Sequence, residues 1–273
     1  MIDLHLHTTA SDGLLAPAAL VARAAACGLT TISVTDHDTI ASFTEADEAA
    51  RRHRVRLVTG VEITAIEDGR DVHMLAYFID PLDAAFAEFL HLQRADRLRR
   101  VRSIAERLEA LGYPIDYEPL LAPGSSQGGR SVGRPQLADA LVATGHARSR
   151  DDAFNRFLAE GAPAFVPRSG PRPETVISVA RDAGGVVSVA HPGLTKMDHI
   201  IPRLARAGLA SLEVRHSDHD PATEARYRQL AATHGLATSG GSDFHGDVGR
   251  RAALLGCITI SDEDLAQLEN RRP

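Results

Sequence analysis

The chain has 273 residues, of which 44% are hydrophobic and 24% charged, so it is long enough to bury a large core and has an ordinary globular composition. Its net charge of −6 argues against a broad nucleic-acid surface and against binding to an anionic membrane. No apolar run approaches a membrane span, the N-terminus lacks the features of a signal peptide, and two distant cysteines fit a reducing compartment, so we expect a cytoplasmic protein.

The first predicted element is a strand that begins at residue 2 and reads IDLHLH. Alternate side chains of a strand face the same way, so His5 and His7 share a face and lie about 6.5–7 Å apart along it. Such a pair can bind one metal ion, although two histidines at this spacing are more often ordinary surface residues. The pair therefore has to be interpreted together with the residues at the ends of the other strands.

Strands and helices alternate along most of the chain. After the first strand, helices are expected over 17–27, 44–53, 174–183, 198–207 and 221–234, and strands over 31–35, 55–63, 72–77, 186–190, 211–215, 236–239 and 254–260. Strands that alternate with helices of about 10 to 15 residues favour parallel pairing, as in an α/β barrel. Asp68-Gly69 is a hairpin signal between two of the strands.

Residues 83–170 interrupt this alternation. They comprise a long helical stretch, a loop rich in Pro, Gly and Ser, and two short helices, expected over 83–111, 113–132, 134–144 and 151–160. We expect a barrel formed by 1–82 and 171–273, with the metal site, and a mostly helical insertion over 83–170 that covers the active-site mouth. The arginine-rich run 94–107 is typical of a solvated helix face with interspersed acids, and a nucleic-acid track is the alternative.

Residues that can bind metals stand at the ends of most predicted strands. The carboxyl ends of parallel barrel strands meet at one face, so side chains distant in sequence converge there. The set has six imidazoles and three carboxylates: His5, His7, Asp12, His37, Glu62, His73, His191, Asp243 and His245. Both groups bind Zn²⁺, Mn²⁺ and Fe²⁺, and nine are too many for one ion. We therefore expect two or three divalent ions, with Mn²⁺, Fe²⁺ and Zn²⁺ all open.

Each of these residues alone has an ordinary explanation. Asp36-His37-Asp38 fits a capping turn, and Glu62 fits a strand-end salt bridge. Five other histidines lie in predicted helices or at helix ends and are expected to be ordinary residues: His53, His91, His146, His199 and His234. The metal-site interpretation rests on the coincidence of positions, because burying so many unpaired imidazoles and carboxylates at one mouth is costly without cations.

Six stretches resemble, in family order, the motifs of the PHP family, the polymerase and histidinol phosphatase phosphoesterases: IDLHLHTTASDG, ISVTDHD, GVEIT, VHMLAYFID, VAHPG and GGSDFH. The resemblance implies an α/β fold, a distorted (β/α)7 TIM-like barrel. It assigns one metal to His5, His7, Glu62 and Asp243, a second to Asp12, His37 and His245, and a third to Glu62, His73 and His191. Glu62, Asp243 and His191 are accordingly expected to carry catalysis.

Within the family, three stretches resemble the stand-alone group that acts on nucleoside 3′,5′-bisphosphates and trims RNA from the 5′ end: SVGRPQLADALVATG, FNRFLAEGAPAFVPR and LEVRHSDHD. This implies a phosphorylated nucleotide or a short oligonucleotide as substrate, with no membrane partner and no stable complex with a double-stranded nucleic acid. Relatives commonly carry His where Gln136 stands, and a shorter polar residue or His where Arg168 stands.

A phosphate ester repels hydroxide, and divalent ions remove this obstacle by binding the phosphoryl oxygens and lowering the pKa of bound water toward about 7. We expect attack by a hydroxide that bridges the ions, with no covalent enzyme intermediate. Substrate contacts are expected from four residues near the same mouth: Arg134, Arg168, His216 and His219. The planar fork of an arginine suits bidentate contact with phosphate.

Two other functions stay open on this reasoning. The chain could hydrolyse histidinol phosphate or another small phosphomonoester, or it could be a non-catalytic domain that binds a metal or a nucleotide. The complete set of candidate ligands favours an enzyme. A substrate panel with Mn²⁺ separates these alternatives.

Overall fold

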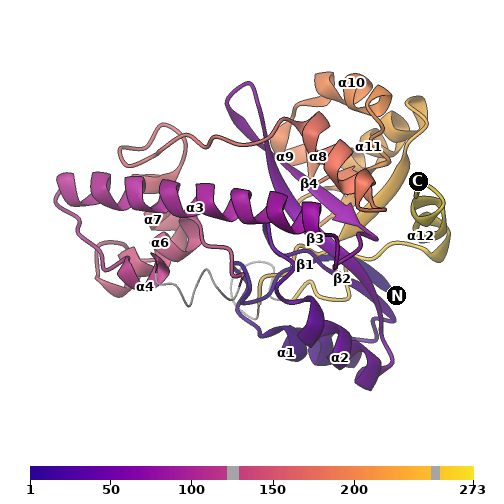
Figure 1. Ribbon diagram of the computed structural model, residues 1–273, viewed down its shortest axis with the longest axis horizontal. Helices are drawn as coiled ribbons and strands as arrows, with labels where there is room; N and C mark the ends of the chain where they lie inside the picture. The colour runs from indigo at the N-terminus through magenta and orange to yellow at the C-terminus, as the bar shows by residue number, and fades with distance from the viewer. Residues whose placement is uncertain (122–128, 247–252) are drawn as a thin grey trace.

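The computed structural model describes residues 1–121, 129–246 and 253–273. One sheet contains seven strands in sequence order: β1 (Ile2–Leu6), β2 (Thr31–Val34), β3 (Arg56–Glu67), β4 (Arg70–Tyr77), β5 (Val186–Val189), β6 (Ser211–His216) and β7 (Ala237–Gly241). The sheet curls back on itself, because Leu6 of β1 bridges Phe244, just beyond β7, and the His7 amide donates to the Phe244 carbonyl at 3.0 Å. The expected distorted seven-strand barrel is thus confirmed (Figure 1).

Strand β4 runs antiparallel to both of its neighbours, whereas the other pairs in the sheet are parallel. The chain reverses at Asp68 and Gly69, whose φ angles of +50° and +75° fit the Asp-Gly hairpin signal in the sequence. Because of this reversal, the N-terminal half of β4 lies where the carboxyl ends of the parallel strands meet. His73 therefore reaches the mouth of the barrel from the opposite direction.

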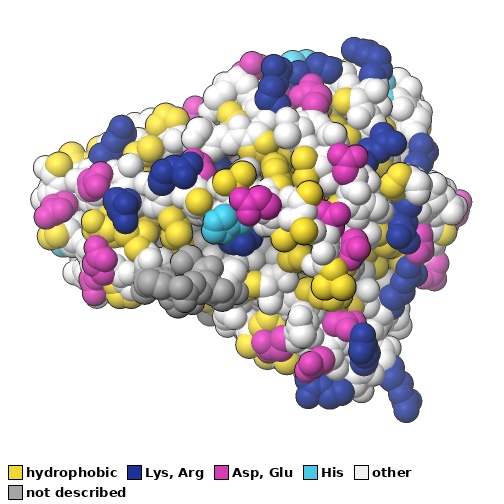
Figure 2. Space-filling model, viewed as in Figure 1, with side chains coloured by type: hydrophobic (Ala, Val, Ile, Leu, Met, Phe, Trp, Pro, Cys, Tyr) yellow, Lys and Arg dark blue, Asp and Glu magenta, His cyan; other side chains and the backbone are white. Residues whose placement is uncertain are grey.

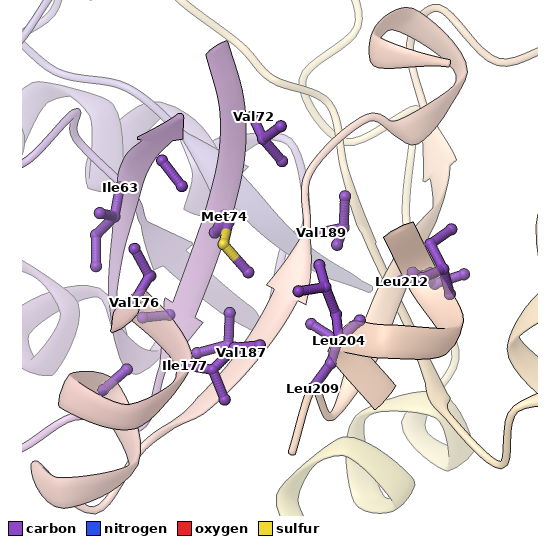
Figure 3. Close-up of a cluster of buried hydrophobic side chains, with 14 of the residues drawn as sticks. Ile63, Val72, Met74, Val176, Ile177, Val187, Val189, Leu204, Leu209 and Leu212 are labelled. Carbon is purple, nitrogen blue, oxygen red and sulfur yellow. The ribbon is translucent and has the colours of Figure 1, made fainter. Parts of the chain in front are cut away.

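Helices cover the outside of the barrel in two apolar layers. The first layer packs β1 and β2 against α1 (Pro17–Ala26) and α2 (Phe43–His53). The second packs β3 to β6 against α8 (Pro173–Asp182), α10 (Ile201–Arg206) and α11 (Pro221–Thr233). Figure 3 shows part of it, with Met74 of β4 among the side chains of Val176, Val187 and Leu204. Each such side chain stabilises the fold by about 1.5–3 kcal/mol on full burial.

Strand β1 departs from the strict alternation that its sequence predicts. Its pairing with β2 shifts register between Asp3 and Leu6, as at a β-bulge. Leu6 consequently packs under α1 and α2, whereas Leu4 packs in a separate cluster with Leu75.

The strand expected over 254–260 is reduced to a single bridge between Ile260 and Ile2, and α12 (Asp262–Glu269) follows it. Ile260 is thus the one residue of this segment that pairs with β1.

The described residues of 83–170 form helices that extend away from the barrel: α3 (Ala84–Ala110), α4 (Glu118–Leu121), α6 (Arg134–Ala143), α7 (Arg150–Ala153) and a π-helical turn (Phe154–Leu158). They share an apolar cluster that includes Ile104, Leu108, Leu137 and Phe157. In Figure 1 the long α3 leaves the barrel, and α4, α6 and α7 gather along its far half. The expected loop over 113–132 lies partly outside the described residues, and its described part includes α4. In the described part of the chain, no helix combines the length and the apolar character needed to cross a membrane.

Candidate active site

Four of the sequence-predicted ligands form a closed ring of atoms at the mouth of the barrel. The Nε2 atoms of His5 and His7 both lie 3.3 Å from Glu62 Oε2, and they lie 3.3 Å and 3.2 Å from Asp243 Oδ1. Ligand atoms about 2.0–2.1 Å from a tetrahedral ion are about 3.3–3.4 Å apart. Both buried nitrogens also lack a hydrogen-bond partner among the described residues, although these oxygens are within reach. The arrangement fits atoms that converge on a cation rather than on one another.

A second group surrounds Asp12, in the loop after β1. Asp12 Oδ1 lies 3.3 Å from His245 Nε2 and 3.6 Å from His7 Nδ1, while Oδ2 lies 3.6 Å from His37 Nε2. These four residues bring one candidate ligand atom each to within 4.8 Å of the others.

The other oxygen of Glu62 faces a third group. Glu62 Oε1 lies 2.8 Å from His73 Nδ1 and 3.1 Å from His191 Nε2. The most compact set around Glu62 on this side combines His73 with His37, whose Nδ1 is 3.1 Å from Glu62 Oε2. All nine predicted ligands thus meet at one mouth, and the assignment of His191 to a third ion stays a prediction.

The pKa values of the side chains in this cluster are shifted in different directions. Burial raises the pKa values of Glu62 and Asp243, but the surrounding imidazoles outweigh burial and hold both pKa values well below normal. Burial lowers the pKa of His7, yet Asp243 and Glu62 outweigh it and raise this pKa to about 10. Burial lowers the pKa of His37 to about 3. The carboxylates are therefore ionised and ready to bind cations, and protons on imidazoles balance part of their charge when no cation is bound.

Three residues of this region have a left-handed backbone, which is rare outside glycine. Asp38, His191 and Asp243 have φ angles of 51°, 27° and 52°. Such conformations cost of order 1–3 kcal/mol each and persist where the surroundings hold them. Glu213 accepts a hydrogen bond of 2.7 Å from the His191 amide, which is one such restraint.

Glu213 is a candidate site residue that the sequence reasoning missed. It is buried in β6, and its Oε1 accepts a hydrogen bond of 2.8 Å from His5 Nδ1. This contact fixes the ring so that Nε2 faces Glu62 and Asp243, as a carboxylate behind a metal-binding histidine does. The available signal was a charged residue inside the buried apolar strand SLEV, because such residues are seldom buried without a partner.

Of the two histidines expected to contact substrate, His216 brings a candidate ligand atom to within 4.8 Å of those of His5 and Asp243, whereas His219 contacts backbone atoms. His216 is fully buried, and its Nδ1 accepts the Asp218 amide hydrogen at 3.1 Å, so its Nε2 carries the proton of the neutral ring and faces Asp243 Oδ2 at 3.3 Å. His219 Nε2 accepts the Gly193 amide hydrogen at 3.1 Å, and its Nδ1 donates to the Val214 carbonyl at 2.8 Å. Both rings thus have fixed tautomers and hold neighbouring backbone or ligands in place.

A cavity of about 140 Å³ adjoins the ligand cluster. Asp12, His37 and His73 line it, and we call the whole cluster of nine ligands to which they belong the metal wall. Four arginines from residues 83–170 also line this cavity, and we call them the arginine wall: Arg97, Arg100, Arg134 and Arg168.

Arg134 and Arg168 were predicted as substrate contacts, whereas Arg97 and Arg100 were assigned to a solvated helix face. The missed signal is their spacing of three residues on the side of α3 that also buries Val101 and Ile104.

Asp38 anchors one pair of these arginines. Its fully buried Oδ2 accepts hydrogen bonds from Arg97 Nε at 2.5 Å and Arg168 Nη2 at 2.7 Å. Burial raises the pKa of Asp38, but the two guanidinium groups outweigh it and hold this pKa well below normal. Arg168 Nε is buried and has no hydrogen-bond partner among the described residues.

Asp71 contacts the other pair more loosely. Its Oδ2 lies 3.4 Å from Arg134 Nη2 and 3.9 Å from Arg100 Nη1. Burial lowers the pKa of Arg100 to about 10, which leaves it charged at neutral pH. Arg100 Nη2 is buried without a hydrogen-bond partner in the described chain. Because two aspartates face four arginines, the wall keeps an excess of two positive charges, which suits a phosphate dianion.

A second cavity of about 260 Å³ shares Asp71, His73 and Arg134 with the first. Its further lining includes Phe165, His191 and Leu194. The two cavities therefore meet at β4, beside the metal wall.

Gln136 connects the arginine wall to the metal wall. Its Nε2 donates to the Ser11 carbonyl at 2.7 Å, next to Asp12, and its Oε1 accepts from the Gly133 amide at 2.8 Å. It thereby fixes the start of α6 against the loop that carries Asp12.

Positive charge is concentrated in this cavity rather than spread over the face shown in Figure 2. That face shows Lys and Arg side chains interspersed with Asp and Glu and no continuous basic track. Within the run 94–107, Arg94 and Arg97 contact Asp38, while Arg99 pairs with Asp96 on the surface. The run is therefore neither a uniform solvated face nor an open basic surface.

Comparison with known proteins gives consistent similarities. The PHP domain family matches residues 3–120. The 5′-3′ exoribonuclease Rnm of Escherichia coli (strain K12) is 36% identical over 250 residues, which cover 89% of this chain and 84% of that protein. The 3′,5′-nucleoside bisphosphate phosphatase of Chromobacterium violaceum is 32% identical over 256 residues, covering 91% and 89%. A Bifidobacterium adolescentis crystal structure, assigned as a metal-dependent phosphoesterase, has a TM-score of 0.89 and 35% identity, covering 100% of this chain and 96% of that one.

Proposed function

Because this chain belongs to the PHP domain family and is a metal-dependent phosphoric ester hydrolase, we propose that it removes the 3′-phosphate from nucleoside 3′,5′-bisphosphates. We also propose that it shortens RNA oligonucleotides from the 5′ end with the same site. Two relatives support this choice, one named a 3′,5′-nucleoside bisphosphate phosphatase and one a 5′-3′ exoribonuclease.

The observation that carries the proposal is the pairing of two unlike walls in one cavity. The metal wall offers clustered imidazoles and carboxylates, and the arginine wall offers four guanidinium groups with an excess of two positive charges. A substrate with a single phosphate uses only one wall. A substrate with two phosphates on one sugar uses both, one as the reacting ester and one as an anchor.

The sizes of the two cavities favour one direction of binding for the nucleotide chain. The arginine wall faces a space of about 140 Å³, which suits a terminal phosphate, whereas the adjoining cavity of about 260 Å³ continues past His191 and Leu194. With a 5′-phosphate on the arginines, the 3′ ester reaches the metal wall and the rest of an oligonucleotide continues into the second cavity. The same geometry then releases one 5′-nucleotide from either substrate.

The residues of this chain perform separable tasks in the proposed reaction. Two or three divalent ions (Mn²⁺, Fe²⁺ or Zn²⁺) held by the nine ligands supply, when bound, charge neutralisation at the phosphoryl oxygens and a lowered pKa for bound water. Glu62 and Asp243 would be shared ligands of these ions, and Glu213 keeps His5 oriented through its contact with His5 Nδ1. We propose His191 as a further catalytic residue, because it contacts Glu62 and lines the second cavity.

Arg134 and Arg168 are the proposed contacts to the second phosphate, and residues 83–170 are the proposed insertion that covers the mouth. Arg134 lies over the rings of Phe154 and Phe165 at 5.8 Å, which limits its motion and orients its fork. Ordered donors of this kind bind a phosphate without further loss of side-chain freedom.

A substrate panel with Mn²⁺-loaded protein tests the proposal. We expect kcat/KM for a nucleoside 3′,5′-bisphosphate to exceed that for the matching 3′-monophosphate by about tenfold or more, since charged hydrogen bonds to the second phosphate are lost in the latter. The nucleotide product should be the 5′-monophosphate. Equal values for the two substrates, or faster hydrolysis of histidinol phosphate, would contradict it and favour a general or small-molecule monoesterase.

A further inference from the structure

Asp71 lies between the two walls of the cavity. It precedes His73 by two residues on β4, so both side chains leave the same face, about 6.6–6.8 Å apart along the strand. His73 contacts Glu62 at the metal wall, and Asp71 contacts Arg134 and Arg100 at the arginine wall. Asp71 also lines both cavities.

The carboxylate of Asp71 keeps unused capacity to accept hydrogen bonds. Its contacts with the arginines, at 3.4 Å and 3.9 Å, are longer than those of the fully buried Asp38, at 2.5 Å and 2.7 Å. Its side chain is 26% exposed, toward the space that the two cavities share. An ionised carboxylate offers about four acceptor positions, so two long ion pairs, both to Oδ2, leave positions free for a ligand.

Given the proposed function, the position of Asp71 indicates which part of a bound substrate lies next to its carboxylate. A substrate that spans the two walls has its sugar between them, beside Asp71. In a nucleoside 3′,5′-bisphosphate the free sugar hydroxyl is the 2′-hydroxyl, which adjoins the 3′ ester at the metal wall. We propose that Asp71 accepts a hydrogen bond from this 2′-hydroxyl and so selects ribose over deoxyribose, an inference that rests on the proposed function.

The competing role for Asp71 is to hold Arg100 and Arg134 and nothing more. That role affects every substrate that uses the second phosphate, with or without a 2′-hydroxyl. A direct contact instead affects the ribose substrate selectively. The two roles therefore predict different ratios between the rate on the ribose substrate and the rate on the deoxyribose substrate.

The experiment compares a ribonucleoside 3′,5′-bisphosphate with its 2′-deoxy counterpart, using full-length Mn²⁺-loaded protein. We expect the wild type to favour the ribose form by about 10- to 100-fold in kcat/KM, the range for a hydrogen bond to a charged group. In Asp71→Ala this preference should disappear because the ribose value falls, while the deoxyribose value changes much less. Asp71→Asn keeps an acceptor oxygen but loses the charge, so it should retain part of the preference.

Asp47→Asn is the matched control. Asp47 on α2 is also ion-paired and has a similar side-chain exposure of 27%, but it pairs with Arg51 on the outer surface of the barrel. It should keep the wild-type preference, and metal content should be equal in all variants. If Asp71→Ala does not fold, Asp71→Asn tests the contact instead, and its preference for ribose over deoxyribose must be smaller than that of the wild type.

Three results separate the possible failures. An unchanged ribose preference in Asp71→Ala, or an equal loss on both substrates, overturns the contact. Equal rates on both substrates in the wild type overturn the inference but leave the proposed function intact. Absence of hydrolysis of either bisphosphate by metal-loaded wild type overturns the proposed function itself.

Discussion

The metal wall and the arginine wall of the active-site cavity are built by opposite means. The metal wall takes its side chains from the ends of barrel strands and the loops after them, and places imidazole nitrogens 2.8–3.6 Å from carboxylate oxygens, close enough for both to bind the same cation. The arginine wall takes its side chains from α3, from the start of α6 and from the segment before α8, and Asp38 and Asp71 neutralise half of its charge. The metal wall would hold divalent cations, and these cations and the arginine wall would each bind one phosphate of a substrate that carries two.

The largest expected effect comes from breaking the metal wall. His7→Ala removes a ring that faces both Glu62 and Asp243, so at least one ion is lost or displaced. We expect kcat to fall by about 1,000-fold or more, because the ions supply several kcal/mol of charge stabilisation. The measurements are turnover of the bisphosphate and elemental analysis. Circular dichroism should show an intact fold, and a wild-type rate would refute the ligand assignment.

The affinity of the metal wall for cations should also depend on pH, and the pKa of His7 sets the direction of this dependence. Its carboxylate neighbours outweigh burial and raise its pKa to about 10, so the metal-free ring is protonated near neutral pH. An ion must displace this proton, and its affinity therefore rises with pH, by up to about tenfold per pH unit for each proton released. Mn²⁺ titration calorimetry between about pH 6 and pH 8, in buffers of different ionisation enthalpy, measures both the affinity and the proton count. Equal affinity at both pH values would contradict the prediction.

The smallest of these effects comes from weakening the arginine wall. Arg134→Ala removes a guanidinium group that faces both cavities, so KM for the bisphosphate should rise by about 10-fold, while bound metal stays unchanged. Hydrolysis of a 3′-monophosphate should change little, which distinguishes the loss of an anchor from a damaged metal wall. Arg99→Ala, on the exposed side of α3 with its side chain 68% exposed, is the matched control. An unaltered KM in Arg134→Ala would count against the anchor.

The two walls also differ in how far the sequence predicts them. The metal wall was predictable because histidines and carboxylates recur at strand ends, and strand ends of a barrel converge whatever the details of packing. The direction of β4 was likewise indicated by Asp68-Gly69.

The arginine wall was only partly predictable. A run of arginines on a helix looks solvated unless the acids that face it are known, and Asp38 and Asp71 lie far from Arg97 and Arg100 in sequence. The roles of His216 and His219 depend on hydrogen bonds from the Asp218 and Gly193 amides, which fix their tautomers and cannot be derived from residue spacing.

The hairpin between β3 and β4 determines which side chains β4 presents to the mouth of the barrel. Side chains alternate along β4, so slipping its pairing with β3 by one residue would exchange its two faces. Asp71 and His73 would then turn into the helix-covered layer, and Val72 and Met74 would face the mouth. A tight turn of two surface residues, Asp68 and Gly69, thus determines which chemistry this strand presents, and lengthening that turn by one residue would disable the enzyme without altering any ligand.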